Sequence, residues 1–124
     1  MSGSNDEVVL RFPAQPEYGR ILRVGAAALG IRQGLSFAEI DDLRLVIDEA
    51  VTLLLTSAPT DSALSAVFRF DHGRLELELA CDTPNLLGDG AVQRFDTAAG
   101  TLIDDYDVEP ANCWLRIRKT PAPV

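Results

Sequence analysis

Alternation of apolar and polar residues along the chain predicts five strands and a turn that joins two of them. The clearest run is 74–81, where leucines alternate with acidic residues, so one side faces the core and the other faces water. A tight hairpin turn at 71–73, which contains His72, precedes this run. The predicted strands cover residues 8–14, 63–70, 74–81, 106–110 and 112–119.

Apolar residues that recur every three or four positions predict three helices. The first helix opens at Pro16 and stops at Gly30, and its apolar face carries Ile21, Val24 and Ala28. The predicted helices cover residues 16–29, 36–57 and 92–105.

The order of these segments is β-α-α-β-β-α-β-β. Helices clustered with hairpin strands indicate an α+β fold, a two-layer α/β sandwich with helices on one face of a mixed, mostly antiparallel sheet. The 124 residues suffice for a single domain, 1–124, with one core. Small and polar residues at 1–6 and the short C-terminal segment 120–124 predict flexible tails.

The long helix at 36–57 has one ordinary face and one unusual face. A capping box of Ser36 and Glu39 opens it, and at 100° per residue its core stripe centres on Ile47. On the opposite face a carboxylate lies among branched apolar side chains, so that face is expected to line a pocket or to contact another element or a partner. The core stripe comprises Ile40, Leu43, Ile47, Ala50, Val51 and Leu54, and the opposite face comprises Asp42, Leu45, Val46, Glu49 and Leu53.

Glu49 and Leu53 are four residues apart and therefore neighbours on that opposite face. A carboxylate and an amide at this spacing could together hold a hydrated Mg²⁺ and its phosphates, but Leu53 offers no oxygen. Asp48 and Thr52 repeat the spacing about 100° away around the helix and are not expected to replace the pair.

The charge of the chain narrows the range of partners. Eleven basic and nineteen acidic residues give a net charge of −8, which disfavours direct binding to nucleic acid and favours a partner with a basic surface. No apolar run is long enough to span a bilayer, and the first residues lack a basic region and a signal-like apolar core. A cytoplasmic protein without a membrane association is therefore expected.

The chain has few of the side chains that most often carry chemistry. With Cys81 and Cys113 as its two cysteines and His72 as its one histidine, neither a zinc site nor a Ser-His-Asp mechanism is expected. Two interpretations of the cysteines stay open: small buried hydrophobic residues of a reducing compartment, or a redox-sensing pair.

Three segments resemble the RsbW-type anti-sigma factors, small serine kinases of the GHKL (histidine-kinase-like ATPase) superfamily with the Bergerat fold. The sequence DDLRLVIDEAVTLLLTSA is similar to the N-box helix of that family. RFPAQPEYGRILR is similar to its opening strand and first helix, and RLELELACD to the strand that leads to the adenine-contacting aspartate of the G1 box. The chain looks most similar to a degenerate actinobacterial subfamily.

The resemblance implies roles for three residues of the nucleotide site. Glu49 matches the general base, and Leu53 stands where the family has its magnesium-binding asparagine. Asp82 stands in the adenine-contacting position, but it is followed by TPNLL rather than by the glycines that let a backbone approach a nucleotide. Without the metal ligand and the phosphate clamps, Glu49 is a vestigial base, and a plain helix-face carboxylate paired with a cation or water is the alternative.

Tyr18, Gly19 and Arg20 match an aromatic-small-arginine triplet of the family, which implies that Tyr18 and Arg20 contact protein partners. A cation near the start of a helix gains nothing from the helix dipole, which favours a partner role for Arg20. A solvated surface arginine is the alternative.

The function implied by the resemblance is that of an anti-sigma factor. Such a protein sequesters an alternative, stress- or sporulation-type sigma factor by protein contact, forms a homodimer, and is regulated by a STAS-type anti-anti-sigma factor. No cofactor or only weakly bound ATP is expected, and no Mg²⁺. The alternatives are an active serine kinase that phosphorylates its STAS antagonist, and a regulatory scaffold of the same fold with another partner.

Overall fold

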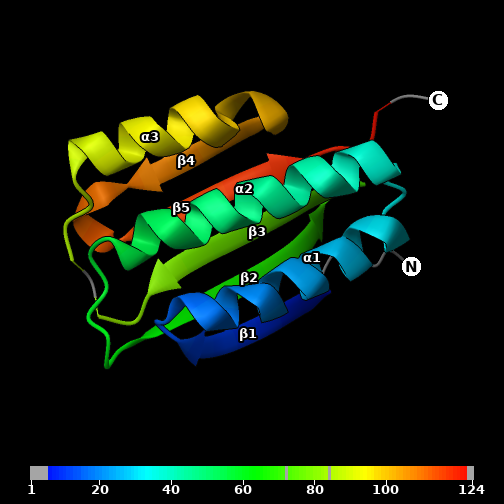
Figure 1. The fold of residues 1–124 in the computed structure, drawn as a ribbon. Coiled ribbons are helices and arrows are strands. Elements are labelled where there is room, and N and C mark those ends of the chain that lie inside the picture. Colours follow the sequence, from blue (N-terminus) through cyan, green and yellow to red (C-terminus); the bar gives the residue numbers. More distant parts are fainter. Residues whose placement is uncertain (1–5, 72, 84, 123–124) are drawn as a thin grey trace.

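The computed structural model describes residues 6–71, 73–83 and 85–122 and contains one five-stranded sheet (Figure 1). The strand order is β1-β2-β3-β5-β4, and all four pairings between neighbours are antiparallel. The sheet was predicted to be mixed, so the structure corrects this detail and confirms the predicted strands to within two residues at each end. The strands are β1 Glu7–Pro13, β2 Ala63–Asp71, β3 Arg74–Cys81, β4 Asp105–Glu109 and β5 Trp114–Lys119.

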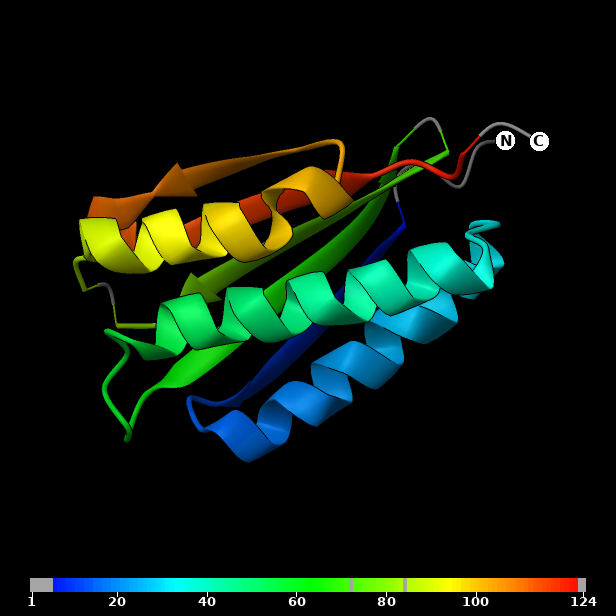
Figure 2. The same ribbon diagram turned by 45° about the horizontal axis from the view of Figure 1, so that its top comes forward.

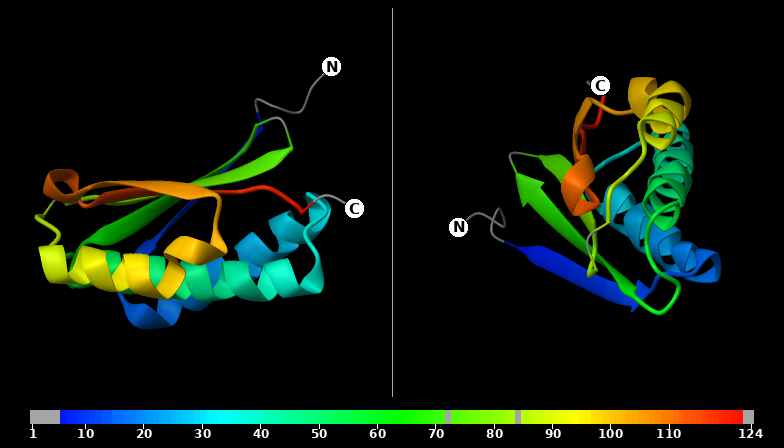
Figure 3. Two further views of the ribbon diagram at one scale, coloured as in Figure 1. Left: turned by 90° about the horizontal axis from the view of Figure 1, so that it is seen from above. Right: turned by 90° about the vertical axis from the view of Figure 1, so that its left-hand side faces the viewer.

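Three α-helices lie together on one face of this sheet (Figure 3), which confirms the predicted two-layer α+β sandwich. The central helix is α2, between α1 on the β1 side and α3 on the β4 side (Figure 2). No helix in the described parts of the chain is both long and apolar enough to cross a membrane. The helices are α1 Gly19–Arg32, α2 Phe37–Leu55 and α3 Asp89–Ala99, with short 3-10 turns η1 Pro16–Tyr18, η2 Gly100–Leu102 and η3 Pro110–Asn112.

Helix α2 forms as predicted. Ser36 accepts a hydrogen bond from the Glu39 N–H, and the Glu39 carboxylate accepts one from the Ser36 N–H, so both halves of the capping box are present. The core stripe around Ile47 is buried along its whole length. The opposite face is only partly open, because Val46 and Leu53 are also buried while Leu45 is exposed.

Helix α1 ends later than Gly30, where the sequence predicted its stop. An added Cβ at Gly30 would lie 2.7 Å from Ile40 and 2.9 Å from Leu35, so glycine here permits close packing against α2 rather than termination. The turn is made four residues later by Gly34, whose φ of +91° is costly for any other residue.

The predicted apolar face of α1 is wrong. The structure buries Leu22, Ala26 and Gly30, while Ile21 is 54% exposed and Val24 is 66% exposed. The helix has apolar residues on two opposite sides, and the spacing alone does not say which side meets the sheet.

The C-terminal half differs from prediction in two places. Helix α3 begins at Asp89, three residues early, and becomes the 3-10 turn η2 at Gly100. A flexible tail was predicted at 120–124. Residues 120–122 of this segment are held by two hydrogen bonds: Thr120 Oγ1 donates to Asp104 at 2.6 Å, and the Ala122 N–H donates to Glu39 at 2.9 Å. His72, residues 1–5 and residues 123–124 lie outside the described residues.

Candidate functional site

Glu49 and Leu53 lie in a pocket between α2 and α3, here called the α2–α3 pocket. Its volume is about 260 Å³, below the roughly 300–1,000 Å³ of most small-molecule sites. One wall comes from the side of α2 that the sequence singled out, and the other comes from the first two turns of α3. The pocket is lined by Glu49, Thr52, Leu53, Thr56, Gly90, Ala91, Arg94 and Phe95.

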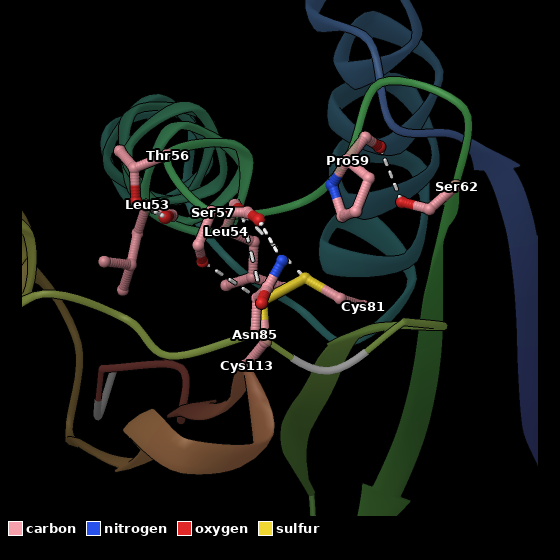
Figure 4. The surroundings of a disulfide bond; sticks show 9 residues. All are labelled: Leu53, Leu54, Thr56, Ser57, Pro59, Ser62, Cys81, Asn85 and Cys113. Atoms are coloured by element: carbon pink, nitrogen blue, oxygen red, sulfur yellow. Dashed lines mark hydrogen bonds between the residues drawn. A yellow bond between two sulfur atoms is a disulfide. The ribbon is translucent and has the colours of Figure 1, made fainter.

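The two walls of the α2–α3 pocket supply few groups that could hold an ion. Glu49 is the one carboxylate in the lining and Arg94 the one cation. Leu53 is 2% exposed and packs into the core, and its carbonyl accepts a hydrogen bond from Thr56 Oγ1 at 2.6 Å (Figure 4). The position that the resemblance assigns to a metal ligand therefore carries a buried hydrocarbon side chain.

The donor set of this pocket does not fit a magnesium-bound nucleotide. Mg²⁺ takes oxygen ligands in octahedral geometry and is usually held by carboxylates together with the phosphates of the nucleotide. Leu53 has no side-chain oxygen, and nowhere in the described residues do three His, Cys, Asp or Glu side chains gather as a metal site. Glu49 is the one carboxylate of the lining, which therefore does not supply the set of ion ligands and phosphate clamps on which phosphoryl transfer depends.

Asp82 lies away from the α2–α3 pocket. It follows β3 and accepts hydrogen bonds from Arg11 of β1 at 2.6 Å and from Ser65 of β2 at 2.9 Å. The hydrogen bond from Ser65, followed in strength by the one from Arg11, holds the pKa of the Asp82 carboxyl below its ordinary value. It lines a separate pocket with the loop 60–62, so the structure does not bring Asp82 and Glu49 into one site.

Tyr18 and Arg20 point to different environments at the start of α1. Tyr18 is half-buried and packs against the core. Arg20 is exposed and lines a third pocket, of about 190 Å³, between α1 and the C-terminal half of α2. Arg23 lines the same pocket and forms an ion pair with Asp48 at 3.2 Å, so Arg20 is the more available cation for a partner.

Cys81 and Cys113 form a disulfide between the end of β3 and the residue before β5 (Figure 4). Their Cα atoms are 5.6 Å apart, although 32 positions separate them in the sequence. Both sulfurs lie 3.9 Å from the Leu54 carbonyl, under the C-terminal end of α2. The sequence left open two small buried residues or a redox-sensing pair; the structure places the two sulfurs in a disulfide, and a redox role stays a prediction.

The sequence did not single out Arg94, Phe95 or Arg23, which complete these pockets. Phe95 and Ala99 are four residues apart and both buried, so apolar spacing could have identified the inner face of α3. No pattern along the chain indicated that Arg94 would stand across a pocket from Glu49, because that proximity arises from the packing of α3 against α2.

The architecture is shared with a solved structure. No family model matches the chain. A crystal structure of the RsbU and RsbW domains of a Mycobacterium tuberculosis protein superposes with a TM-score of 0.64 at 14% identity, over 94% of this chain and 32% of the other. The two-layer fold that the sequence predicted is therefore shared with part of that solved structure.

Two curated proteins are similar to this chain in sequence. An anti-sigma-F factor RsbW from M. tuberculosis is 36% identical over 86 residues, covering 68% of this chain and 51% of the relative. A serine-protein kinase RsbW from Bacillus velezensis is 32% identical over 83 residues, covering 64% of this chain and 52% of the relative. The chain spans about half the length of these curated relatives. It is a homologue of the RsbW proteins, and the predicted resemblance is confirmed.

Proposed function

We propose that this protein is an anti-sigma factor that sequesters a sigma factor by direct contact and does not depend on phosphoryl transfer. Its similarity to an anti-sigma-F factor RsbW supports the class of partner. The net charge of −8 also suits a partner that carries a basic, nucleic-acid-binding surface.

The observation that carries the non-catalytic part of the proposal is Leu53 in the α2–α3 pocket. Leu53 is buried at the position of a metal ligand, whereas the helix and sheet around it are intact. Sequestration needs only a stable surface, so a fold that keeps its helices and loses its ion site is suited to binding without catalysis. We further propose that any nucleotide binds weakly and without Mg²⁺.

An active serine kinase is the second candidate. Glu49 is retained beside a pocket, Arg94 stands across from it, and several relatives are named serine-protein kinase RsbW. In this case the substrate would be the antagonist of the protein.

Calorimetry with Mg²⁺-ATP separates the two candidates. The proposal expects no Mg²⁺-dependent binding and no difference between the wild type and Glu49→Ala. Glu109→Ala, on β4 and outside the α2–α3 pocket, is the control. Tight binding that requires Mg²⁺ and disappears in Glu49→Ala alone would contradict the non-catalytic proposal and favour the kinase.

Co-purification from the native host, followed by mass spectrometry, tests the partner. A recovered sigma factor supports the proposal, and repeated recovery of an unrelated protein would support the scaffold alternative. Arg20→Glu should weaken binding to the recovered sigma factor by about tenfold. Arg44→Glu, an exposed arginine on α2, is the control. Equal affinity of wild type and Arg20→Glu would remove Arg20 from the interface.

The remaining parts of the proposal concern the setting in which the protein acts. A STAS-type anti-anti-sigma factor would release the sigma factor, and the protein would act in the cytoplasm as a homodimer. Tyr18 would support this surface indirectly, because its ring packs into the core immediately before α1.

A further inference from the structure

The disulfide between Cys81 and Cys113 lies where the end of α2 meets two connections of the sheet (Figure 4). Cys81 ends β3 and is followed by the connection 82–88 that leads to α3, and Cys113 lies between η3 and β5. Both sulfurs face the Leu54 carbonyl at the end of α2, at 3.9 Å. A change at this bond therefore acts on α2, on the connection to α3 and on η3 together.

Two hydrogen bonds hold the same junction. Asn85 Nδ2 donates to the Ser57 carbonyl at 2.9 Å, which ties the connection to the end of α2. The Leu87 N–H donates to the Pro110 carbonyl at 2.9 Å, which ties the connection to η3. Of these three links, the disulfide is the one that a change in redox conditions removes.

The sheet itself does not depend on the disulfide. Strands β3 and β5 pair along their lengths, and the Cys81 N–H donates to the Cys113 carbonyl at 3.0 Å. These backbone hydrogen bonds remain when the sulfurs part. Reduction is therefore expected to act on the elements around the disulfide and to leave the fold intact.

The last turn of α2 is the element most sensitive to reduction. The Leu54 carbonyl already accepts hydrogen bonds from the Ser57 N–H at 3.2 Å and the Ala58 N–H at 3.0 Å, which use both of its lone pairs. A disulfide has no S–H group and does not compete for this oxygen. Reduction places two S–H donors beside it. Two unbonded sulfurs also need more room than a disulfide, in an interior that is packed without large voids.

This last turn is continuous with the surface that the proposed function assigns to the partner. Leu55 directly follows Leu54 and lines the pocket that contains Arg20. Thr52, one turn earlier, lines both that pocket and the α2–α3 pocket. A loosened end of α2 therefore alters the wall beside the arginine that is proposed to contact a sigma factor.

We propose that the Cys81–Cys113 pair is a redox switch: the oxidised protein holds its sigma factor tightly, and the reduced protein holds it weakly. The inference rests on the proposed function for the identity of the partner and for a cytoplasmic setting. Disulfides in that compartment are usually redox-sensing or catalytic rather than structural. Because coupling between two equilibria is reciprocal, sigma binding makes the disulfide harder to reduce by the same factor.

The reductant is a dithiol, such as a protein of the thioredoxin class. One of its thiolates attacks Cys81 Sγ, which is 5% exposed where Cys113 is 0% exposed. The S–S bond breaks, and Cys113 leaves as a thiolate that takes a proton from water; Ser57 Oγ lies 3.8 Å from this sulfur and can donate to it. The second thiolate of the reductant then attacks its own sulfur in the mixed disulfide, which releases Cys81 as a thiolate that takes a second proton. Two electrons pass to the pair, and the dithiol becomes a disulfide.

Hydrogen exchange, followed by NMR, tests the switch without any sigma factor. After reduction with dithiothreitol, the amides of Ser57 and Ala58 should exchange about tenfold faster, because their acceptor is shared with the new thiols. Amides of residues 40–46, in the first half of α2, should exchange at the same rate in both states. The double variant Cys81→Ala, Cys113→Ala should not respond to dithiothreitol. Equal protection of Ser57 and Ala58 in the two states of the wild type would overturn the proposal.

Titration with the sigma factor recovered by co-purification tests the effect on binding. The reduced wild type should bind about tenfold more weakly than the oxidised wild type. Leu43→Ala is the control for a general loss of stability, because it removes a side chain that is 2% exposed in the first half of α2 and keeps the disulfide. Equal affinity of the oxidised and reduced wild type, or an equal loss in oxidised Leu43→Ala, would overturn the switch.

A redox titration with glutathione completes the thermodynamic cycle. Free thiols are counted by alkylation at graded ratios of [GSH]² to [GSSG], with and without the sigma factor. The sigma factor should raise the midpoint ratio by the same factor by which reduction weakens its binding, and an unchanged midpoint would refute the coupling. Recovery of a different partner would overturn the proposed function alone, since the same titrations with that partner still decide whether the pair is a switch.

Discussion

The two faces of the sheet are built from alternate residues of the same strands, yet they differ in what they contribute. The inner face, under the helices, carries large apolar side chains such as Phe68, Leu79 and Leu115, all of them buried. The outer face carries arginines and carboxylates paired with one another. The comparison separates the residues that hold the fold together from those that make its stability depend on pH and salt.

Arg69 and Arg118 organise the outer face. Arg69 forms ion pairs with Glu7 at 2.6 Å, with Glu76 at 3.5 Å and with Glu78. Arg118 forms ion pairs with Glu76 at 3.3 Å, with Asp107 at 3.2 Å and with Asp105. Because Glu76 is shared, the two arginines belong to one network that crosses β1, β2, β3, β5 and β4.

The largest effect is expected from a substitution on the inner face. Phe68→Ala should lower the free energy of unfolding by about 4 kcal/mol, because it removes a fully buried ring and leaves a cavity. Val67→Ala, one residue earlier and on the outer face, should cost less than about 1 kcal/mol. Urea denaturation of both variants checks the comparison, and equal losses would contradict the division between the faces.

The second largest effect is expected from breaking the disulfide at one end of the inner face. Because it closes a loop across 32 positions, reducing it in the oxidised protein should lower the free energy of unfolding by about 3 kcal/mol. Denaturation with and without a reducing agent measures this difference. The double variant Cys81→Ala, Cys113→Ala should show no response to the reductant, and two free thiols in the oxidised native protein would disprove the pairing.

The inner face of the sheet and α2 could be predicted from the sequence because one apolar stripe dominates each of them. Helix α1 could not, since Ile21 and Val24 form a second apolar side that periodicity cannot distinguish from the core side. Gly30 likewise carries two meanings in a sequence, a helix end or a close helix contact, and the structure selects the second.

The candidate site was predictable only where its residues share one helix. Glu49 and Leu53 are neighbours because of their spacing on α2, so the sequence placed them together correctly. Arg94 reaches the same pocket from α3, and Asp82 is separated from it on a different side of the fold. Both facts depend on packing between segments that are distant in the sequence.

A smaller effect is expected from restoring a polar side chain in the α2–α3 pocket. Leu53→Asn should cost about 2 kcal/mol of unfolding free energy, because it places an amide where the side chain is buried. It should not confer Mg²⁺-dependent ATP binding. Asp82 would still lie in a separate pocket, and the residues after Asp82 would still lack the glycines that let a backbone approach a nucleotide. Denaturation and calorimetry measure the two quantities, and a gain of Mg²⁺-ATP binding would show that Leu53 alone had removed the site.

The smallest effect is expected on the outer face, where it should depend on pH. Burial by itself raises the pKa of Glu78, but hydrogen bonds from Arg69 and Trp114 outweigh it, and the pKa lies below its ordinary value. A carboxyl whose pKa is lowered on folding stabilises the protein above its unfolded pKa of roughly 4, and this contribution is lost as the pH falls through the folded pKa.

Arg69→Ala should therefore cost about 1 kcal/mol near neutral pH. The difference from the wild type should shrink below about pH 4, as Glu78 becomes protonated, and also in about 1 M salt. Urea denaturation from pH 7 to pH 3 follows it, with Arg44→Ala, whose contact with Asp41 is 3.8 Å, as the control. A difference that stays constant over this range would mean that Arg69 contributes through the packing of its stem, so the outer face would resemble the inner one.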